Sequence, residues 1–379
     1  MARVQFMLVG GRLPPNIIGA TLLRPDTVGV VASKDAVEEV GLLEEALRNM
    51  VGPPEWVRVV DPHDYDVNVG ICEEFTRQYS HGNELYFNIT CGTKIMAMAA
   101  YEAARRCPEA RVFYVDTAGR RIIWLVGRGE AVGSFRISIA DYLAAYGREA
   151  MRKPVFETLT FGKEQALTAA ALLARDRERS VPFLERVRKS QGNYPCTVHA
   201  RADGEQSLMN DLARLGLIDV VSQDRFVIRS NEDWNFFKGD WLEIFVWDQA
   251  RRLQEPDGQA TFDEVEIGLE IPSGEATKEI DVACLRDGRL IHCSCKTGGD
   301  AFNTAPLDEL AAVSSLIGGR YCTRVFVTHR RLGDVDERRK QKFREQARQR
   351  EIVVIAGEEL VDVGAILKKQ INNPDFRNV

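Results

Sequence analysis

Two short runs of residues, Lys278–Arg286 and Arg289–Lys296, hold the side chains best suited to chemistry, and only Asp287-Gly288 separates them. An Asp-Gly pair between two such runs predicts a β-hairpin with a two-residue turn. This turn sets Arg286 opposite Arg289 and fixes the register of the whole hairpin. The positions of the remaining side chains follow from that register.

Four polar side chains fall on one face of the predicted hairpin, because side chains alternate along a strand. Asp281 lies opposite Ser294 in this register, and Glu279 lies opposite Lys296. Two carboxylates facing a lysine are the arrangement that a metal-dependent phosphodiesterase needs. The alternative is a ladder of surface salt bridges, which cross-strand ion pairs commonly form.

The eight cysteines are scattered and contain no C-x-x-C spacing. Cys293 and Cys295 point away from the polar face, toward a core that they share with Val282. This placement favours structural thiols over a zinc site and a reducing, cytoplasmic environment.

The bulk properties are those of a globular protein with two or three domains. The chain has 379 residues and a net charge of -6, so any contact with nucleic acid must be local. No apolar run approaches the length of a membrane span, and the first residues read as a strand instead of a signal peptide. We therefore expect no membrane association.

Residues 1 to about 130 alternate strands and helices in the manner of an open α/β sheet. Ligands of such sheets bind at the carboxyl ends of the strands. The predicted strands are Val4–Val9, Thr27–Ala32, Trp56–Val60, Glu84–Ile89, Arg111–Val115 and Arg121–Leu125, and the predicted helices include Ala36–Met50 and Thr93–Arg106.

Residues from about 145 to 230 have a different pattern, in which helices precede a hairpin-like end. The predicted helices are Lys163–Arg175, Pro182–Ser190 and Glu205–Leu215. This order resembles a winged-helix module, and a plain connector is the alternative. A second α/β unit begins at about Asp233, where we expect a helix from Lys238 toward Leu253. The hairpin follows, and then helices and strands at Phe302–Ile317, Arg324–Thr328, Val335–Arg350 and Ile352–Ile355. The basic stretch Arg330–Arg350 reads as a solvated helix or as an edge that follows phosphates.

Two loops of the first region could bind an anion. One leaves the first strand through Gly10 and Gly11, and the other enters a helix at Gly92-Thr93-Lys94. Glycine lets the backbone approach a ligand, and a helix N-terminus offers unpaired N–H groups. On these residues alone, a plain strand-to-helix turn is an equal alternative.

The pattern Asn88-x-Thr90-x-Gly92-Thr93-Lys94-x-Met96 resembles the signature of CARF domains, and Pro15-Asn16 is similar to their first ligand loop. The family consists of Rossmann-like sensors of cyclic oligoadenylates in type III CRISPR defence. The resemblance implies a homodimer that encloses cyclic tetra-adenylate on its two-fold axis. The implied ligand-binding residues are Gly10, Gly11, Arg12, Pro15, Asn16, Ser33, Lys34, Thr90, Gly92, Thr93 and Lys94.

The second region resembles the PD-(D/E)xK nucleases through Glu243, Glu279-x-Asp281 and Lys296. In that family carboxylates hold Mg²⁺ or Mn²⁺, and the lysine orients or helps to deprotonate the attacking water. The acidic residue two positions before the lysine is replaced by Ser294. The implied catalytic residues are Glu243, Glu279, Asp281, Ser294 and Lys296, with Asp281, the backbone carbonyl of Cys295, and Glu243 or Glu279 as metal ligands.

The combined resemblance covers essentially the whole chain. It implies an α/β protein with a Rossmann-like CARF domain at residues 1–145, a helical or winged-helix-like connector at 146–232 and a PD-(D/E)xK-type nuclease domain at 233–379. The expected function is an endonuclease that cuts DNA, RNA or both when cyclic oligoadenylate binds. The alternative is a ligand-sensing regulator that binds nucleic acid with an inactive nuclease domain.

Overall fold

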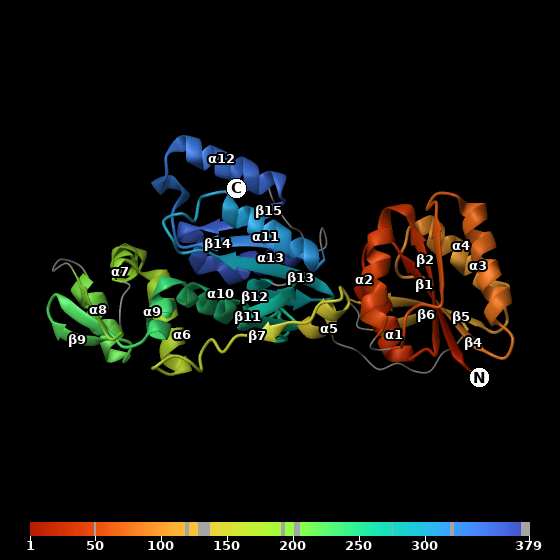
Figure 1. Ribbon diagram of the computed structural model, residues 1–379, viewed down its shortest axis with the longest axis horizontal. Coiled ribbons are helices and arrows are strands. Elements are labelled where there is room, and N and C mark those ends of the chain that lie inside the picture. Colours follow the sequence, from red (N-terminus) through yellow and green to blue (C-terminus); the bar gives the residue numbers. More distant parts are fainter. Residues whose placement is uncertain are drawn as a thin grey trace. The chain divides into compact units, whose positions relative to one another are not determined.

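The computed structural model describes residues 1–48, 51–117, 121–127, 137–190, 194–200, 205–274, 276–318 and 322–372. These residues form two compact units, Met1–Glu149 and Ala150–Val379, and each contains an α/β sheet (Figure 1). The predicted fold class is therefore confirmed. No helix within the described ranges is long and apolar enough to cross a membrane.

The first unit is built on a six-stranded sheet in the order β3-β2-β1-β4-β5-β6, in which only the β5–β6 pair is antiparallel. Helices α1 and α2 cover one face and α3 and α4 the other (Figure 1), which explains why the central strands are buried along most of their length. The strands are β1 (Arg3–Val9), β2 (Thr27–Ser33), β3 (Trp56–Val60), β4 (Glu84–Asn88), β5 (Ala110–Asp116) and β6 (Arg121–Val126), and the helices are α1 (Pro14–Leu23), α2 (Val37–Arg48), α3 (Tyr65–Tyr79), α4 (Lys94–Arg105) and α5 (Ile139–Ala144).

The strand order reverses between β1 and β4, which lie side by side in parallel. Open α/β sheets bind ligands at this kind of switch point, outside the carboxyl ends of the strands. The two loops singled out in the sequence follow β1 and β4, so the fold brings both to the same edge of the sheet. Each predicted strand of this unit is present, and the predicted end of the second helix at Met50 lies outside the described residues.

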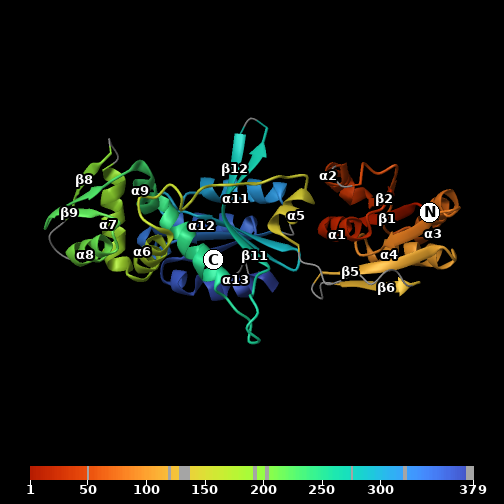
Figure 2. The same cartoon turned by 90° about the horizontal axis from the view of Figure 1, so that it is seen from below.

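The second unit contains a six-stranded sheet in the order β15-β14-β13-β12-β11-β7. Strands β13, β14 and β15 run parallel, whereas β7, β11, β12 and β13 pair antiparallel. The long β11–β12 hairpin projects from the body of the unit (Figure 2). The strands are β7 (Met151–Arg152), β11 (Glu264–Ser273), β12 (Ala276–Arg286), β13 (Arg289–Cys295), β14 (Cys322–Thr328) and β15 (Ile352–Ala356).

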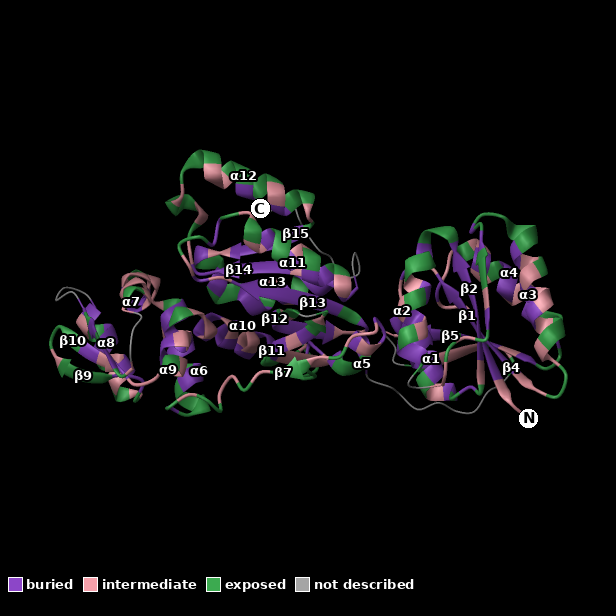
Figure 3. Cartoon of the chain, in the orientation of Figure 1, coloured by how far each residue is buried: buried purple, intermediate pink, exposed green. Residues whose placement is uncertain are grey.

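Helices cover both faces of this sheet. One hydrophobic core joins a sheet face to α10 (Trp241–Arg251) and α13 (Val363–Asn372), and a smaller one joins the other face to α11 (Ala305–Leu316) and α12 (Glu337–Gln349). The central strands β13 and β14 are buried along most of their length (Figure 3). Both layers therefore hold the central strands in place.

The segment predicted as a connector ends in the expected hairpin, with a third strand beside it in the order β8-β10-β9. Its residues lie in the same hydrophobic core as α10 and the large sheet. The domain boundaries at 146 and 232 stay a prediction. The elements of this segment are α6 (Lys163–Arg175), α7 (Arg177–Lys189), β8 (Cys196–His199), α8 (Glu205–Arg214), β9 (Asp219–Ser222), β10 (Arg225–Ile228) and α9 (Asn231–Asn235).

Candidate functional site

Three carboxylates converge at one end of the second unit's sheet. Glu279 and Asp281 come from β12 and Glu243 comes from the first turn of α10. One carboxylate oxygen of each lies within 4.8 Å of those of the other two. Oxygen ligands at this spacing are the type that Mg²⁺ and Mn²⁺ prefer.

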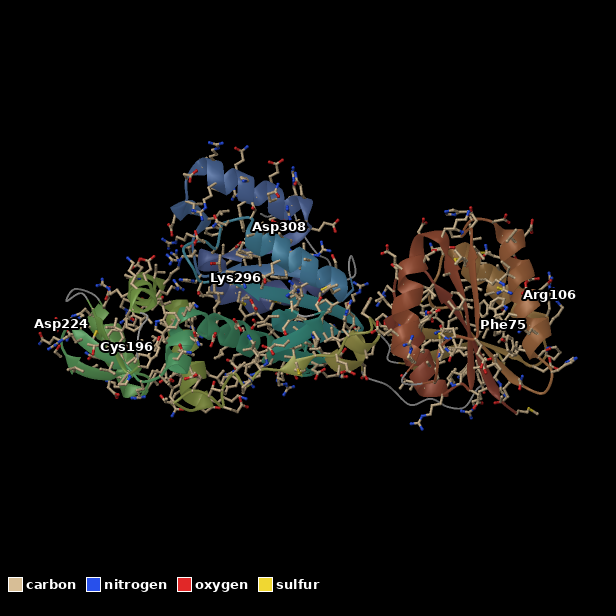
Figure 4. All side chains as sticks on the ribbon, in the orientation of Figure 1. Phe75, Arg106, Cys196, Asp224, Lys296 and Asp308 are labelled. Carbon is tan, nitrogen blue, oxygen red and sulfur yellow. The ribbon has the colours of Figure 1, made fainter. Side chains whose placement is uncertain are left out.

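Asp281 is the centre of this cluster and is buried. Its Oδ2 accepts a hydrogen bond from the backbone N–H of Cys295 at 2.6 Å and lies 3.5 Å from the Nζ of Lys296. The Oγ of Ser294 lies 3.5 Å from the same oxygen. Lys296 is placed beside the carboxylates by the end of β13, and Figure 4 labels it.

The predicted hairpin register is confirmed from Arg286↔Arg289 to Val282↔Cys293. Beyond that pair the β12–β13 ladder stops, and the carboxylate of Asp281 bridges the two strands through Cys295. Asp281 and Ser294 face each other as predicted. Cys293 and Cys295 are buried in the core, also as predicted.

The predicted pair between Glu279 and Lys296 does not form. Glu279 lies on the part of β12 that pairs with β11, opposite Glu270, and it accepts a hydrogen bond from Lys153 at 2.5 Å. Lys153 follows the short strand β7, which pairs with β11 at the edge of the sheet. Its ammonium also lies 3.7 Å from Glu270, so one cation serves both glutamates.

Glu243 is positioned by an irregular helix. Residues Phe236–Asp240 form a π-helical turn between α9 and α10, a geometry that often occurs at functional sites. Burial raises the pKa of the Asp240 carboxyl to about 6. Burial, and then the charge of Asp281, raises the pKa of Glu243 well above its ordinary value.

The π-helical turn also anchors the strand end that carries Lys296. The backbone carbonyl of Lys238 accepts hydrogen bonds from the hydroxyl of Thr297 and, at 3.0 Å, from Nη2 of Arg188 on α7. Thr297 is buried and directly follows Lys296. The hydroxyl therefore ties the lysine-bearing strand to the helix that bears Glu243.

The residues of this cluster fit a divalent cation. Burial, and to a smaller extent the charge of Glu279, raises the pKa of Asp281, although Lys296 and the backbone N–H of Cys295 oppose the rise. A cation of charge two would offset this repulsion with hard oxygen ligands. His292 is not part of the donor set, since it is buried with its Nδ1 3.0 Å from the hydroxyl of Ser314.

The two loops of the first unit meet through glycines. A Cβ on Gly10 would lie 2.6 Å from the Cα of Gly92, so the loops pack backbone to backbone. Thr93 caps α4 by accepting from the N–H of Met96, and its hydroxyl donates to the carbonyl of Pro62 at 3.0 Å. Lys94 begins the helix with an exposed side chain.

The other predicted ligand residues divide into surface and interior positions. Lys34 is exposed and pairs with Asp61 at 3.0 Å. Asn16 is fully buried and donates to the carbonyl of Leu8 at 2.9 Å, so it supports the loop from beneath. Gly11, Pro15 and Ser33 are buried as well, whereas Gly10, Arg12, Thr90, Gly92 and Thr93 are half-buried at the strand ends.

The sequence pattern missed three residues of the carboxylate site. Asp240 lies about one helical turn before Glu243, and the helix predicted from Lys238 already placed the two carboxylates on one side of it. Lys153 is far away in the sequence and gave no signal. Thr297 followed the recognised lysine, but its role depends on a carbonyl that only the π-helical turn presents.

Two families match the chain. Residues 45–142 match the Card1 CARF domain, and residues 230–373 match the Card1-like endonuclease domain. The chain belongs to the CARF-domain nucleases. The predicted family is thus confirmed, and no curated protein matches the chain.

Three solved structures are similar to this chain in fold. Can2 from Sulfobacillus thermosulfidooxidans, solved with cyclic tetra-adenylate, is 21% identical with a TM-score of 0.67 over 97% of both chains. Protein VC1899 from Vibrio cholerae is 20% identical with a TM-score of 0.68 over 98% of both chains. A type III CRISPR defence DNA nuclease activated by cyclic oligoadenylate is 18% identical with a TM-score of 0.50, covering 87% of this chain and 46% of its own.

Proposed function

We propose that this protein is a metal-dependent endonuclease of type III CRISPR defence, activated when cyclic tetra-adenylate binds to its CARF domain. The observation that carries the proposal is the convergence of Glu243, Glu279 and Asp281 beside Lys296, within the region that matches the Card1-like endonuclease domain. The matching CARF domain and the likeness to a cyclic tetra-adenylate complex support the activator. The substrate is DNA, RNA or both.

Each residue of the cluster has a role in phosphodiester cleavage. Asp281, Glu243 or Glu279, and the backbone carbonyl of Cys295 would hold Mg²⁺ or Mn²⁺. The ion would supply an activated water and would neutralise charge on the phosphate. Lys296, whose ammonium lies 3.5 Å from Asp281, would orient that water or stabilise a non-bridging phosphate oxygen. Ser294 contributes a hydroxyl that can orient a water beside Asp281.

The sensor would act as a homodimer with one ring on its two-fold axis. The loops after β1 and β4 would contact the adenylate backbone through Gly10, Gly92 and Thr93, with Lys94 supplying charge. If the ring binds more tightly to one conformation of the dimer, it would increase the population of that conformation. In it, the nuclease domains would be arranged for cleavage. Cleavage would then require the activator.

The test incubates the purified protein with supercoiled plasmid or single-stranded RNA, with Mg²⁺, Mn²⁺ or EDTA, and with or without cyclic tetra-adenylate. We expect cleavage only when metal and activator are both present. Asp281→Asn and Lys296→Ala should each abolish it. Metal-independent cleavage, or full activity of both variants, would refute the proposal.

The second candidate is a ligand-sensing regulator, favoured by the serine at position 294 and by the small sheet β8-β10-β9 beside α7 and α8. The same assay separates the two functions. A regulator would bind nucleic acid in response to the ring and would leave both substrates intact with either metal.

A further inference from the structure

Helix α12 carries a cluster of unpaired positive charges on its exposed side. Its sequence contains six basic and two acidic side chains, although the protein as a whole has a net charge of -6. Four of the basic residues are exposed and form no ion pair with any carboxylate of the described chain: Arg338, Lys342, Arg344 and Arg348. We call these four residues the α12 basic face.

Helix α10 of the same unit shows the opposite arrangement, in which the cations at its C-terminal end share an acidic partner. On α10, Arg251 and Arg252 both pair with Asp248, at 2.7 Å and 2.8 Å. On α12, Arg338 and Lys342 lie four residues apart, as do Arg344 and Arg348, and like charges at this spacing are unfavourable in isolation. Glu345 shares this surface, but it accepts a hydrogen bond from Gln349 at 3.3 Å.

The opposite side of α12 attaches the helix to the sheet. Phe343 and Ala347 are fully buried there, and the ring of Phe343 lies 5.5 Å from that of Phe326 on β14. Burial therefore fixes which side faces solvent. The outer side of α12 is exposed in Figure 3, and charged side chains project from it in Figure 4.

This helix covers the sheet face toward which Asp281 and Ser294 point, whereas Glu243 reaches the cluster from α10 on the other face. Ser294 pairs with Phe326 across β13 and β14, so their side chains share a face, and Ser294 lies 3.5 Å from Asp281. Phe343 of α12 covers that same Phe326. Asp281, Ser294 and Phe326 are thus successive neighbours across three strands, and Phe326 contacts the buried side of α12.

A second connection runs through the loop that follows Lys296. Phe302 of that loop stacks edge-on against Phe343, with 5.2 Å between the ring centroids. Arg339 of α12 donates to Asn303 at 2.8 Å and lies 3.7 Å from Asp300. The helix is thus held against the segment that leaves the proposed catalytic lysine.

We propose that the α12 basic face binds backbone phosphates of the nucleic acid substrate beside the cleavage site, an inference that rests on the proposed nuclease function. From Arg338 to Arg348 the helix rises about 15 Å. One strand of a duplex presents about four phosphates over that length. The length of the α12 basic face therefore equals that of a short tract of one strand. Contacts with phosphates would give affinity without sequence specificity.

The test measures binding of a fluorescent DNA duplex to the full chain with cyclic tetra-adenylate, at several KCl concentrations and in EDTA. Without metal, the measurement does not depend on cleavage. The variant combines Arg338→Gln, Lys342→Gln, Arg344→Gln and Arg348→Gln. The matched control removes the same charge at Lys163→Gln, Arg175→Gln, Lys189→Gln and Lys369→Gln, which pair with no described carboxylate.

We expect the α12 variant to weaken binding at least about tenfold and to lower the slope of log affinity against log salt by about 0.9 for each lost phosphate contact. The control should keep the wild-type slope. Unchanged thermal unfolding and ring affinity in both variants show that the fold is intact. If both variants lose the same slope, or neither does, α12 is not the binding surface.

The outcomes also separate this inference from the proposed nuclease function. Duplex binding that depends on α12, without cleavage in Mg²⁺ or Mn²⁺, would overturn the nuclease and leave the surface standing. Activated cleavage by the wild type, with wild-type binding by the α12 variant, would overturn the surface alone.

Discussion

Ser294 lies beside Asp281 at the position where the related nuclease pattern has a carboxylate. We predict that Ser294→Glu binds Mg²⁺ at least about tenfold more tightly, a gain of about 1.4 kcal/mol. The physical reason is that Mg²⁺ requires near-ideal oxygen coordination and a serine hydroxyl is a poor ligand. Calorimetry gives the affinity, and plasmid cleavage should rise with it.

The metal-free form of Ser294→Glu provides an internal check. A further carboxylate among Asp281, Glu243 and Glu279 adds repulsion, so the variant should melt below the wild type in EDTA and recover on adding Mg²⁺. Ser294→Ala is the matched control, since it removes the hydroxyl and adds no charge. A Ser294→Glu variant with wild-type metal affinity would show that position 294 does not face the ion.

The sequence was enough to predict those residues of the site whose positions depend on local strand and turn geometry alone. A two-residue turn and strict alternation were enough to bring Asp281, Ser294 and Lys296 together. They were not enough for Glu279, because its neighbour depends on where the β12–β13 ladder ends. Lys153, which does pair with Glu279, arrives through the edge strand β7, and no local pattern encodes that pairing.

At the scale of elements, the π-helical turn Phe236–Asp240 joins the helix of Glu243 to the strand of Lys296. We predict that Thr297→Val lowers kcat by about tenfold or more, because misplacement by about 1 Å can cost a hundredfold. The loss of one hydrogen bond should lower the free energy of unfolding by about 1 kcal/mol. Steady-state kinetics and denaturant unfolding measure the two effects.

A conservative variant distinguishes positioning from general destabilisation. Thr297→Ser keeps the hydroxyl that donates to the carbonyl of Lys238, so it should restore kcat while losing one methyl group. A Thr297→Val variant that is destabilised but has wild-type kcat would show that this bond stabilises the fold without positioning Lys296.

The contact between the sensor loops makes a second prediction at this scale. Gly10→Ala should destabilise the first unit by about 1–3 kcal/mol, since the added Cβ overlaps the backbone of Gly92. It should also weaken cyclic tetra-adenylate binding. Gly41→Ala on α2 is the control, because nothing lies within 4 Å of its Cβ, and helix propensity favours alanine by about 0.5–1 kcal/mol.

Element boundaries show why sequence patterns lose precision. The helix predicted from Pro182 begins instead at Arg177, because Asp176 caps it by accepting from the N–H of Arg179 at 3.3 Å. The helix predicted from Lys238 begins as α10 at Trp241, because residues Phe236–Asp240 form the π-helical turn that follows α9. Strands β1, β2 and β4 were predicted more accurately because their apolar runs are buried along most of their length.

At the scale of the whole molecule, the two compact units have separate hydrophobic cores. A change at the carboxylate cluster should therefore not disturb the sensor. We predict that Asp281→Asn binds cyclic tetra-adenylate with wild-type affinity while cleavage is lost. Calorimetry on both proteins checks this, and a large loss of ring affinity would indicate that the units are energetically coupled.

The number of rings bound per chain tests the proposed assembly. In the first unit, the loops after β1 and β4 meet at one edge of the sheet, with Lys94 exposed there. A ring on a two-fold axis would meet the same loops from two chains, so each chain would supply half of the contacts. We predict one cyclic tetra-adenylate per two chains by calorimetry, with a dimer mass by analytical ultracentrifugation. Lys94→Ala would then remove two cations from each ring and should weaken binding by about 1.5–3 kcal/mol per lost charged hydrogen bond. One ring per chain, or full occupancy on a monomer, would contradict the shared site.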